Sequence, residues 1–95
     1  MRKAYLFVYS STIGTRDMIS NYFNHNKMVI HWRYDMNNSY YIISENSSEE
    51  LAKDFRKNFP SGRFLFTELG ENKYGWLTRE SWDLIKSKTR KKTNE

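Results

Sequence analysis

Three residues with chemically useful side chains alternate along one stretch of the chain: His31, Arg33 and Asp35. Alternate residues of a β-strand point to the same face, so these side chains can converge. A histidine base, an arginine that holds phosphate and an aspartate that orients the base would suit metal-independent cleavage of RNA. The same alternation is also what an ordinary half-buried strand produces. We therefore expect a protein without catalytic residues, and keep a ribonuclease built on this trio as an alternative.

Other segments offer little further chemistry. Residues 10–15 form a hydroxyl-rich turn before an expected helix, where backbone amides favour an anion, but the second glycine and the lysine of a P-loop are missing. Capping of the helix by Thr15 explains the turn more simply. His25 stands between two asparagines, which is typical of a loop. The chain has no cysteine, which excludes disulfides and thiol catalysis, and we expect neither a metal nor a cofactor.

Positive charge gathers at the C-terminus. Residues 86–95 contain five basic residues and one acid, a net charge of +4, whereas residues 1–85 contain eleven basic and ten acidic residues, a net charge of +1. Such a cluster attracts polyanions by a salt-screened electrostatic attraction that does not depend on the base sequence of the nucleic acid. Alternatively, the lysines only complement a helix dipole and continue into a solvated end. The basic cluster consists of Lys86, Lys88, Arg90, Lys91 and Lys92.

The elements that position these residues follow from hydropathy patterns. Residues 4–9 are a short apolar strand, and a helix capped by Thr15 follows. Residues 27–35 alternate as a strand, with Trp32 and Tyr34 on one side and the polar trio on the other. Asn37 and Asn38 are a tight-turn pair, because asparagine tolerates positive φ. The chain then returns as a strand over residues 39–44.

A helix, a strand and a last helix follow. Ser47 and Glu50 have the spacing of a capping box at the start of a helix, which residues 60–62 end. Residues 63–69 form a further strand, and Thr78 caps a last helix. The order β-α-β-β-α-β plus a helix predicts an α+β protein, a ferredoxin-like sandwich with an additional C-terminal helix. We expect a single domain over residues 1–88 and a basic tail over residues 89–95.

Two helices cover only one face of such a sheet, so the other face is the main functional question. We place Leu6 and Val8 under the helices and Tyr5 and Phe7 outside, although both sets are apolar and the reverse also fits. Rings edged with cations on that face would form a platform for single-stranded nucleic acid. The predicted nucleic-acid-binding residues are Tyr5, Phe7, Arg33, Tyr40 and Arg63, together with Lys86, Lys88, Arg90, Lys91 and Lys92.

The alternative is that this face is covered. The last helix, with Trp76 and Trp82, can lie across it, or two copies can pair through it. The protein would then be an interaction module, either a homodimer or a phage-type inhibitor or regulator of a defence or toxin–antitoxin system. Protein interfaces favour tryptophan, so Trp76 and Trp82 are the predicted partner-binding residues.

Two resemblances add expectations. Leu6, Phe7 and Val8 resemble the short strand signature of the RNA recognition motif family, which implies base stacking by Phe7. Residues 38–43 supply the aromatics of that family's longer signature without its glycine and basic residue. Size and strand order also resemble small CRISPR-adaptation and toxin–antitoxin dimers. That resemblance implies dimerisation through the sheet or last strand, but residues 9–11 lack the metal-binding aspartate.

A third resemblance covers most of the chain. Residues 32–35, 62–64 and 75–77 look like segments of short prokaryotic and phage proteins of unassigned role. It implies no mechanism.

Composition limits the remaining classes. Hydrophobic residues make up 38% and charged residues 28%, as in globular proteins, and 17% aromatic residues argue against disorder. No apolar run is long enough to span a membrane, and no cleavage-site pattern of a signal peptide follows the N-terminus. We therefore expect a cytoplasmic protein that binds single-stranded nucleic acid, another protein or a second copy of itself.

Overall fold

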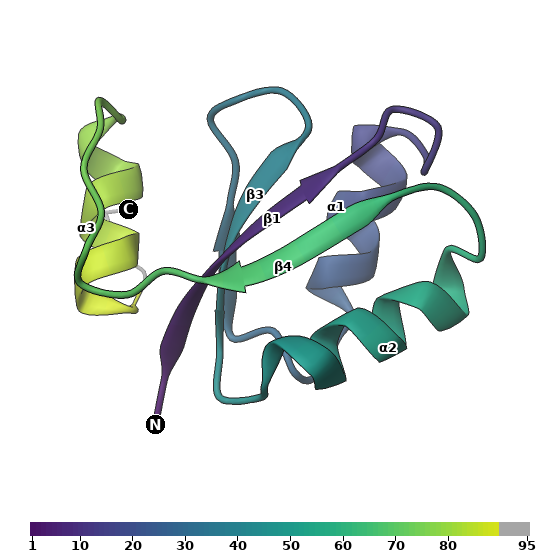
Figure 1. Ribbon diagram of the computed structural model, residues 1–95, viewed down its shortest axis with the longest axis horizontal. Coiled ribbons are helices and arrows are strands. Elements are labelled where there is room, and N and C mark those ends of the chain that lie inside the picture. Colours follow the sequence, from purple (N-terminus) through teal and green to yellow (C-terminus); the bar gives the residue numbers. More distant parts are fainter. Residues whose placement is uncertain (90–95) are drawn as a thin grey trace, which may run out of the picture.

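The computed structural model describes residues 1–89, which form a four-stranded sheet and three helices (Figure 1). The mixed α+β class predicted from the sequence is confirmed. Three members of the basic cluster, Arg90, Lys91 and Lys92, lie outside the described residues. The elements in chain order are β1 (Lys3–Tyr9), α1 (Arg16–Asn24), β2 (His31–Arg33), β3 (Ser39–Ser44), α2 (Ser48–Asn58), β4 (Phe64–Glu68) and α3 (Arg79–Ser87).

The sheet has the strand order β2-β3-β1-β4, and every pair of neighbours is antiparallel. The central strand β1 places Phe7 beside Tyr40 on β3 and Phe66 on β4. The edge strand β2 pairs with β3 through only three residues, from His31 opposite Ile43 to Arg33 opposite Tyr41. The two edges of the sheet are therefore β2 and β4.

Polar residues at the helix starts act as predicted. The Thr15 hydroxyl accepts a hydrogen bond from the Met18 amide, which caps α1. Ser47 and Glu50 form a reciprocal capping box at the start of α2. Asn38 has a φ of 60°, which the turn before β3 requires. These local predictions hold because each depends on neighbours in sequence.

The predicted strand over residues 27–35 is much shorter in the structure. The Asn26 side chain accepts a hydrogen bond from the Met28 amide, and the Asn26 carbonyl accepts one from the Val29 amide. This turn keeps residues 26–29 out of the sheet, so the strand begins only at His31. In a continuous strand, Met28 and Ile30 would lie on one side of the sheet and Val29 on the other. In the structure, Ile30 instead packs on the opposite side of the sheet from both Met28 and Val29.

The main core lies between the sheet and the helices α1 and α2. Tyr5, Phe7 and Tyr40 are each at most 1% exposed within it, packed with side chains such as Phe23 and Phe55. The expectation that these three rings lie on an exposed face is therefore wrong. Burying the larger rings under the two helices removes more apolar surface from water than burying Leu6 and Val8 would, so the reverse orientation of β1 is the observed one.

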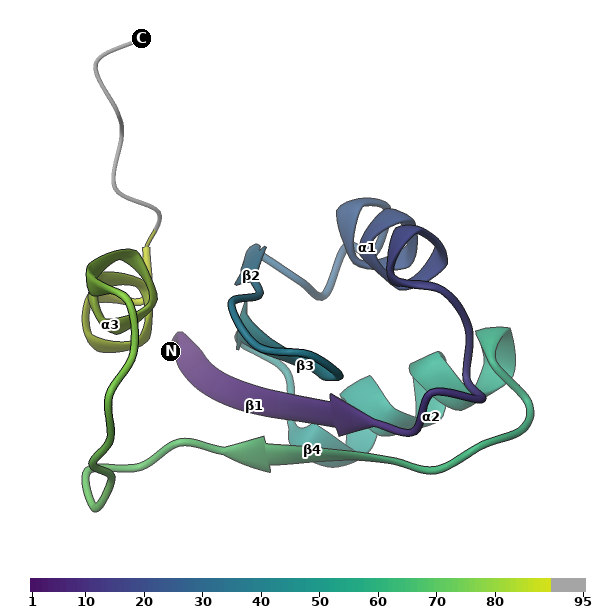
Figure 2. The ribbon, with the colours of Figure 1, turned by 90° about the horizontal axis from the view of Figure 1, so that it is seen from above.

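The helix α3 packs on the other face of the sheet, the face that α1 and α2 leave uncovered. Leu84 and Ile85 join Ala4, Tyr41 and Ile43 in a second, smaller cluster. In Figure 2, α3 lies on the opposite side of the sheet from α1 and α2. The cover is partial, because Leu65 on β4 remains 55% exposed on this face. In residues 1–89, none of the helices is both long enough and apolar enough to cross a bilayer.

Candidate functional site

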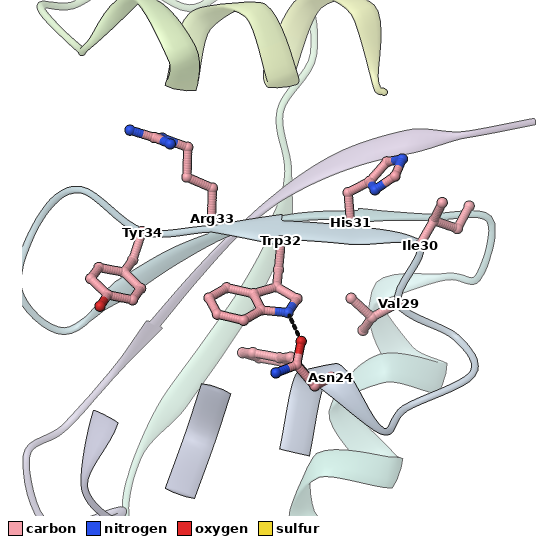
Figure 3. A pocket seen from close by; sticks show the side chains of 8 residues that line it. Asn24, Val29, Ile30, His31, Trp32, Arg33 and Tyr34 are labelled. Carbon is pink, nitrogen blue, oxygen red and sulfur yellow. Dashed lines mark hydrogen bonds between the residues drawn. The ribbon is translucent and has the colours of Figure 1, made fainter. Parts of the chain in front are cut away.

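A groove of about 560 Å³ follows the outer edge of β2 (Figure 3). Its residues come mainly from one continuous stretch, 29–34, and from the end of α1. Trp32 and Tyr34 project to the side of α1, whereas His31 and Arg33 project to the side of α3. The short edge strand thus separates two walls of different chemistry, one aromatic and one basic.

The aromatic wall is held in place by specific contacts. The Trp32 indole nitrogen donates a hydrogen bond of 2.8 Å to the Asn24 side-chain oxygen. The Trp32 and Tyr34 rings are nearly parallel, with centroids 6.2 Å apart. The Arg16 guanidinium lies 3.9 Å from the centroid of the Tyr34 ring and donates to the Met36 carbonyl. Tyr34 is still 45% exposed, so the ring is both oriented and accessible.

The basic wall is tied to α3. The Arg33 Nε donates a hydrogen bond of 3.0 Å to the Ser81 hydroxyl, and an outer nitrogen lies 4.0 Å from a Glu80 carboxylate oxygen. His31 lies two residues away on the same side of the strand. The loose contact with the exposed Glu80 leaves the Arg33 guanidinium able to take another anion.

Asp35 and Arg33 meet at the fully buried Ser81, as partners of one hydroxyl group. Ser81 donates to an Asp35 oxygen at 2.7 Å, and the Tyr41 hydroxyl donates to the other oxygen at 3.2 Å. Burial and the nearby Asp35 charge raise the pKa of Tyr41 to about 12. These bonds favour a role for Asp35 in holding α3 on the sheet. The ribonuclease reading of His31, Arg33 and Asp35 stays a prediction.

The other predicted nucleic-acid-binding residues lie apart from the groove. Arg63 precedes β4, at the edge of the sheet opposite β2. Lys86 and Lys88 lie at the end of α3, where Arg2 from the N-terminus donates a hydrogen bond to the Lys88 carbonyl at 3.0 Å. The tertiary structure therefore adds Arg2 to the described part of the basic cluster, which the sequence order had separated.

The predicted partner-binding tryptophans have different surroundings. Trp76, in the loop before α3, is 87% exposed and forms an edge-to-face pair with Tyr74, which is 88% exposed. Trp82 is half-buried on α3, with the Lys86 ammonium 5.3 Å from its ring centroid. Among residues 1–89, only the Tyr74–Trp76 pair therefore offers two rings almost wholly to solvent.

A second hollow lies between α1 and α2. The Tyr22 hydroxyl donates to an Asp54 carboxylate oxygen at 2.5 Å, and Asn26 donates to the same hydroxyl at 3.0 Å. Burial and this carboxylate raise the pKa of Tyr22 above its usual value. These bonds connect the two helices, which is a sufficient structural role for them.

Trp32 and Tyr34 are the groove residues that the sequence reading did not select. Their i, i+2 spacing was recognised, but a long half-buried strand would have turned both rings into the core. Knowing that this segment is an edge strand would have indicated that its rings are partly exposed. The order of strands in a sheet, however, cannot be read from local sequence patterns. The residues that the structure describes contain no group of three or more metal-binding side chains.

Comparisons with known protein families, curated proteins and solved structures give no match to this chain.

Proposed function

We propose that this protein binds single-stranded nucleic acid in the groove beside β2. One observation supports the proposal above others: the groove has the rings of Trp32 and Tyr34 on one side of a strand and the guanidinium of Arg33 and the imidazole of His31 on the other. Single strands present flat bases and charged phosphates along one path. Proteins without sequence preference bind them by stacking bases on aromatic rings and by placing basic groups along the backbone.

Preorganisation of the groove supports the proposal. Asn24 orients Trp32, and Arg16 orients Tyr34 through a contact with the ring. Side chains that are ordered before binding lose less entropy when a ligand arrives. Arg33 is likewise anchored through its Nε to Ser81, and a phosphate would meet the outer guanidinium nitrogens, one of which lies 4.0 Å from the exposed Glu80 carboxylate. The proposed site thus replaces the platform of Tyr5, Phe7 and Tyr40 expected from the sequence, whose rings are buried.

We also infer that the fold is of the ferredoxin-like class. The observed sheet supports this, because β3 lies between β1 and β2, and β1 lies between β3 and β4. Each helical crossover, through α1 or α2, then connects two parallel strands with one antiparallel strand between them, which is the split βαβ arrangement. In this class β2 is an edge strand, consistent with a groove along its outer side.

The first test is a change of Tyr34 to alanine. Loss of one stacking ring costs about 1–3 kcal/mol per base, so Tyr34→Ala should weaken binding of a labelled oligonucleotide by about 5- to 150-fold. Fluorescence anisotropy with an unstructured single strand measures this directly. Trp76→Ala is the matched control, because it removes an exposed ring outside the groove. Unchanged binding by Tyr34→Ala would contradict the proposed site.

The same pair of variants tests the second candidate function, a protein-interaction module. The almost complete exposure of Tyr74 and Trp76 favours it, because tryptophan and tyrosine often dominate binding energy at interfaces. If the module is a homodimer, the wild-type chain should show a dimer mass by light scattering and Trp76→Ala a monomer mass. A monomer at all concentrations, with oligonucleotide binding sensitive to Tyr34, would decide against it.

A further inference from the structure

The beginning of the chain meets the C-terminal end of α3. Arg2 lies just before β1, and its guanidinium donates to the carbonyl of Lys88, the residue that caps α3. In Figure 1 the N-terminus lies past the yellow, C-terminal end of this helix. Together with the exposed Lys86, these residues form a group of cations that we call the terminal patch: Arg2, Lys86 and Lys88.

The strand register places the terminal patch in line with the basic wall of the groove. Arg33 lies opposite Tyr41, which lies opposite Leu6 on β1. The chain from Leu6 back to Arg2 therefore runs in the same direction as the step from Arg33 to His31. The helix α3 spans this interval, because Ser81 in its first turn contacts Arg33 and Lys88 at its other end contacts Arg2.

Figure 3 shows the same alignment. The helix α3 passes over the side of β2 from which Arg33 and His31 project, and its C-terminal, yellow end lies toward His31. The order along this side of the molecule is therefore Arg33, His31 and then the terminal patch. Acidic side chains are also present, since α3 carries Glu80 beside Arg33 and Asp83 further along.

We propose that the terminal patch continues the groove, so that one strand of several nucleotides contacts both. This inference rests on the proposed function, and it specifies the ligand as an oligonucleotide rather than a mononucleotide or dinucleotide. The four residues from Leu6 to Arg2 span about 13 Å at the rise of a β-strand. At the stacked spacing of about 3.4 Å per nucleotide, that distance corresponds to about four nucleotides.

The test uses the full-length chain and oligothymidylates of two, four, six and ten nucleotides. We expect affinity in anisotropy titrations to rise up to about six nucleotides, as the strand reaches from Tyr34 to the terminal patch. The patch variant removes two of its three cations, by Arg2→Gln with Lys88→Asn, because asparagine tolerates the left-handed backbone at position 88, where φ is 57°. The control variant changes Arg90, Lys91 and Lys92 to glutamine.

The patch variant should bind the dinucleotide as the wild type does and lose the gain that six nucleotides provide. Its slope of log affinity against log salt should fall by about 1.4, the value for two lost phosphate contacts on a single strand. Equal thermal unfolding by circular dichroism excludes a folding defect. An undiminished gain, or a gain lost only in the control variant, would overturn the inference while Tyr34→Ala still reports on the groove. Binding that ignores Tyr34 at every length would instead overturn the proposed function.

Discussion

Ser81 shows how much one small side chain can do when it is buried. Its hydroxyl donates to Asp35 and accepts hydrogen bonds from the Arg33 Nε and the Thr78 hydroxyl. These contacts join α3 to β2 and to the segment directly after β2, although α3 is far from both in the sequence. They also give a structural reason for Arg33 and Asp35 to lie together, since each forms a hydrogen bond with the Ser81 hydroxyl, which the packing of α3 removes from water.

A substitution of Ser81 tests this structural role. Ser81→Ala leaves the Arg33 and Asp35 groups without a shared partner, so the free energy of unfolding should fall by about 1–3 kcal/mol. Urea unfolding followed by circular dichroism measures the change. Ser87→Ala, on an exposed position of the same helix, should cost much less. Equal effects of the two changes would show that the buried bonds contribute nothing specific.

At the scale of elements, the connection between α2 and β4 depends on a glycine. Gly62 has a φ of 95°, and a Cβ there would lie 2.6 Å from the Ile13 side chain. The Arg56 side chain also donates to the Gly62 carbonyl. Backbone conformation and close packing thus both require glycine, and the turn sets where β4 begins.

Replacement of Gly62 by alanine should therefore destabilise the protein. We expect a loss of about 1–3 kcal/mol from the left-handed backbone, increased by the contact with Ile13. Gly70→Ala is the matched control, because nothing lies within 4 Å of a Cβ at that position. Thermal unfolding should separate the two variants, with the midpoint of Gly70→Ala close to that of the wild type. A midpoint for Gly62→Ala equal to that of Gly70→Ala would contradict this account.

At the scale of the whole molecule, the sheet divides two cores of unequal size. The larger cluster joins the sheet to α1 and α2, whereas α3 is held by a smaller cluster around Tyr41 and Ile43. Fewer buried apolar contacts make local opening easier. We therefore expect the amides of α3 to exchange with solvent faster than those of α1 and α2, as measured by hydrogen exchange and mass spectrometry. Equal protection of all three helices would show that they unfold as one unit.

The order of elements could be predicted from the sequence, because caps, turns and short hydrophobic patterns are local. Thr15, Ser47, Asn38 and Thr78 all have the predicted roles. The length of β2 could not be predicted, because the Asn26 turn that shortens it looks like a continued alternating strand. The direction of the β1 side chains was also open, since Leu6 and Phe7 are both apolar and either can be buried.

The sequence by itself determined the α+β class, the starts of the helices and the presence of basic residues near the C-terminus. Only the tertiary structure decided that Phe7 is buried, that Trp32 and Tyr34 line an edge, and that Arg2 joins Lys88. The physical reason is that capping and turn formation depend on residues a few positions apart. The faces and edges of a sheet depend instead on which strands pair and how much apolar surface each packing arrangement removes from water.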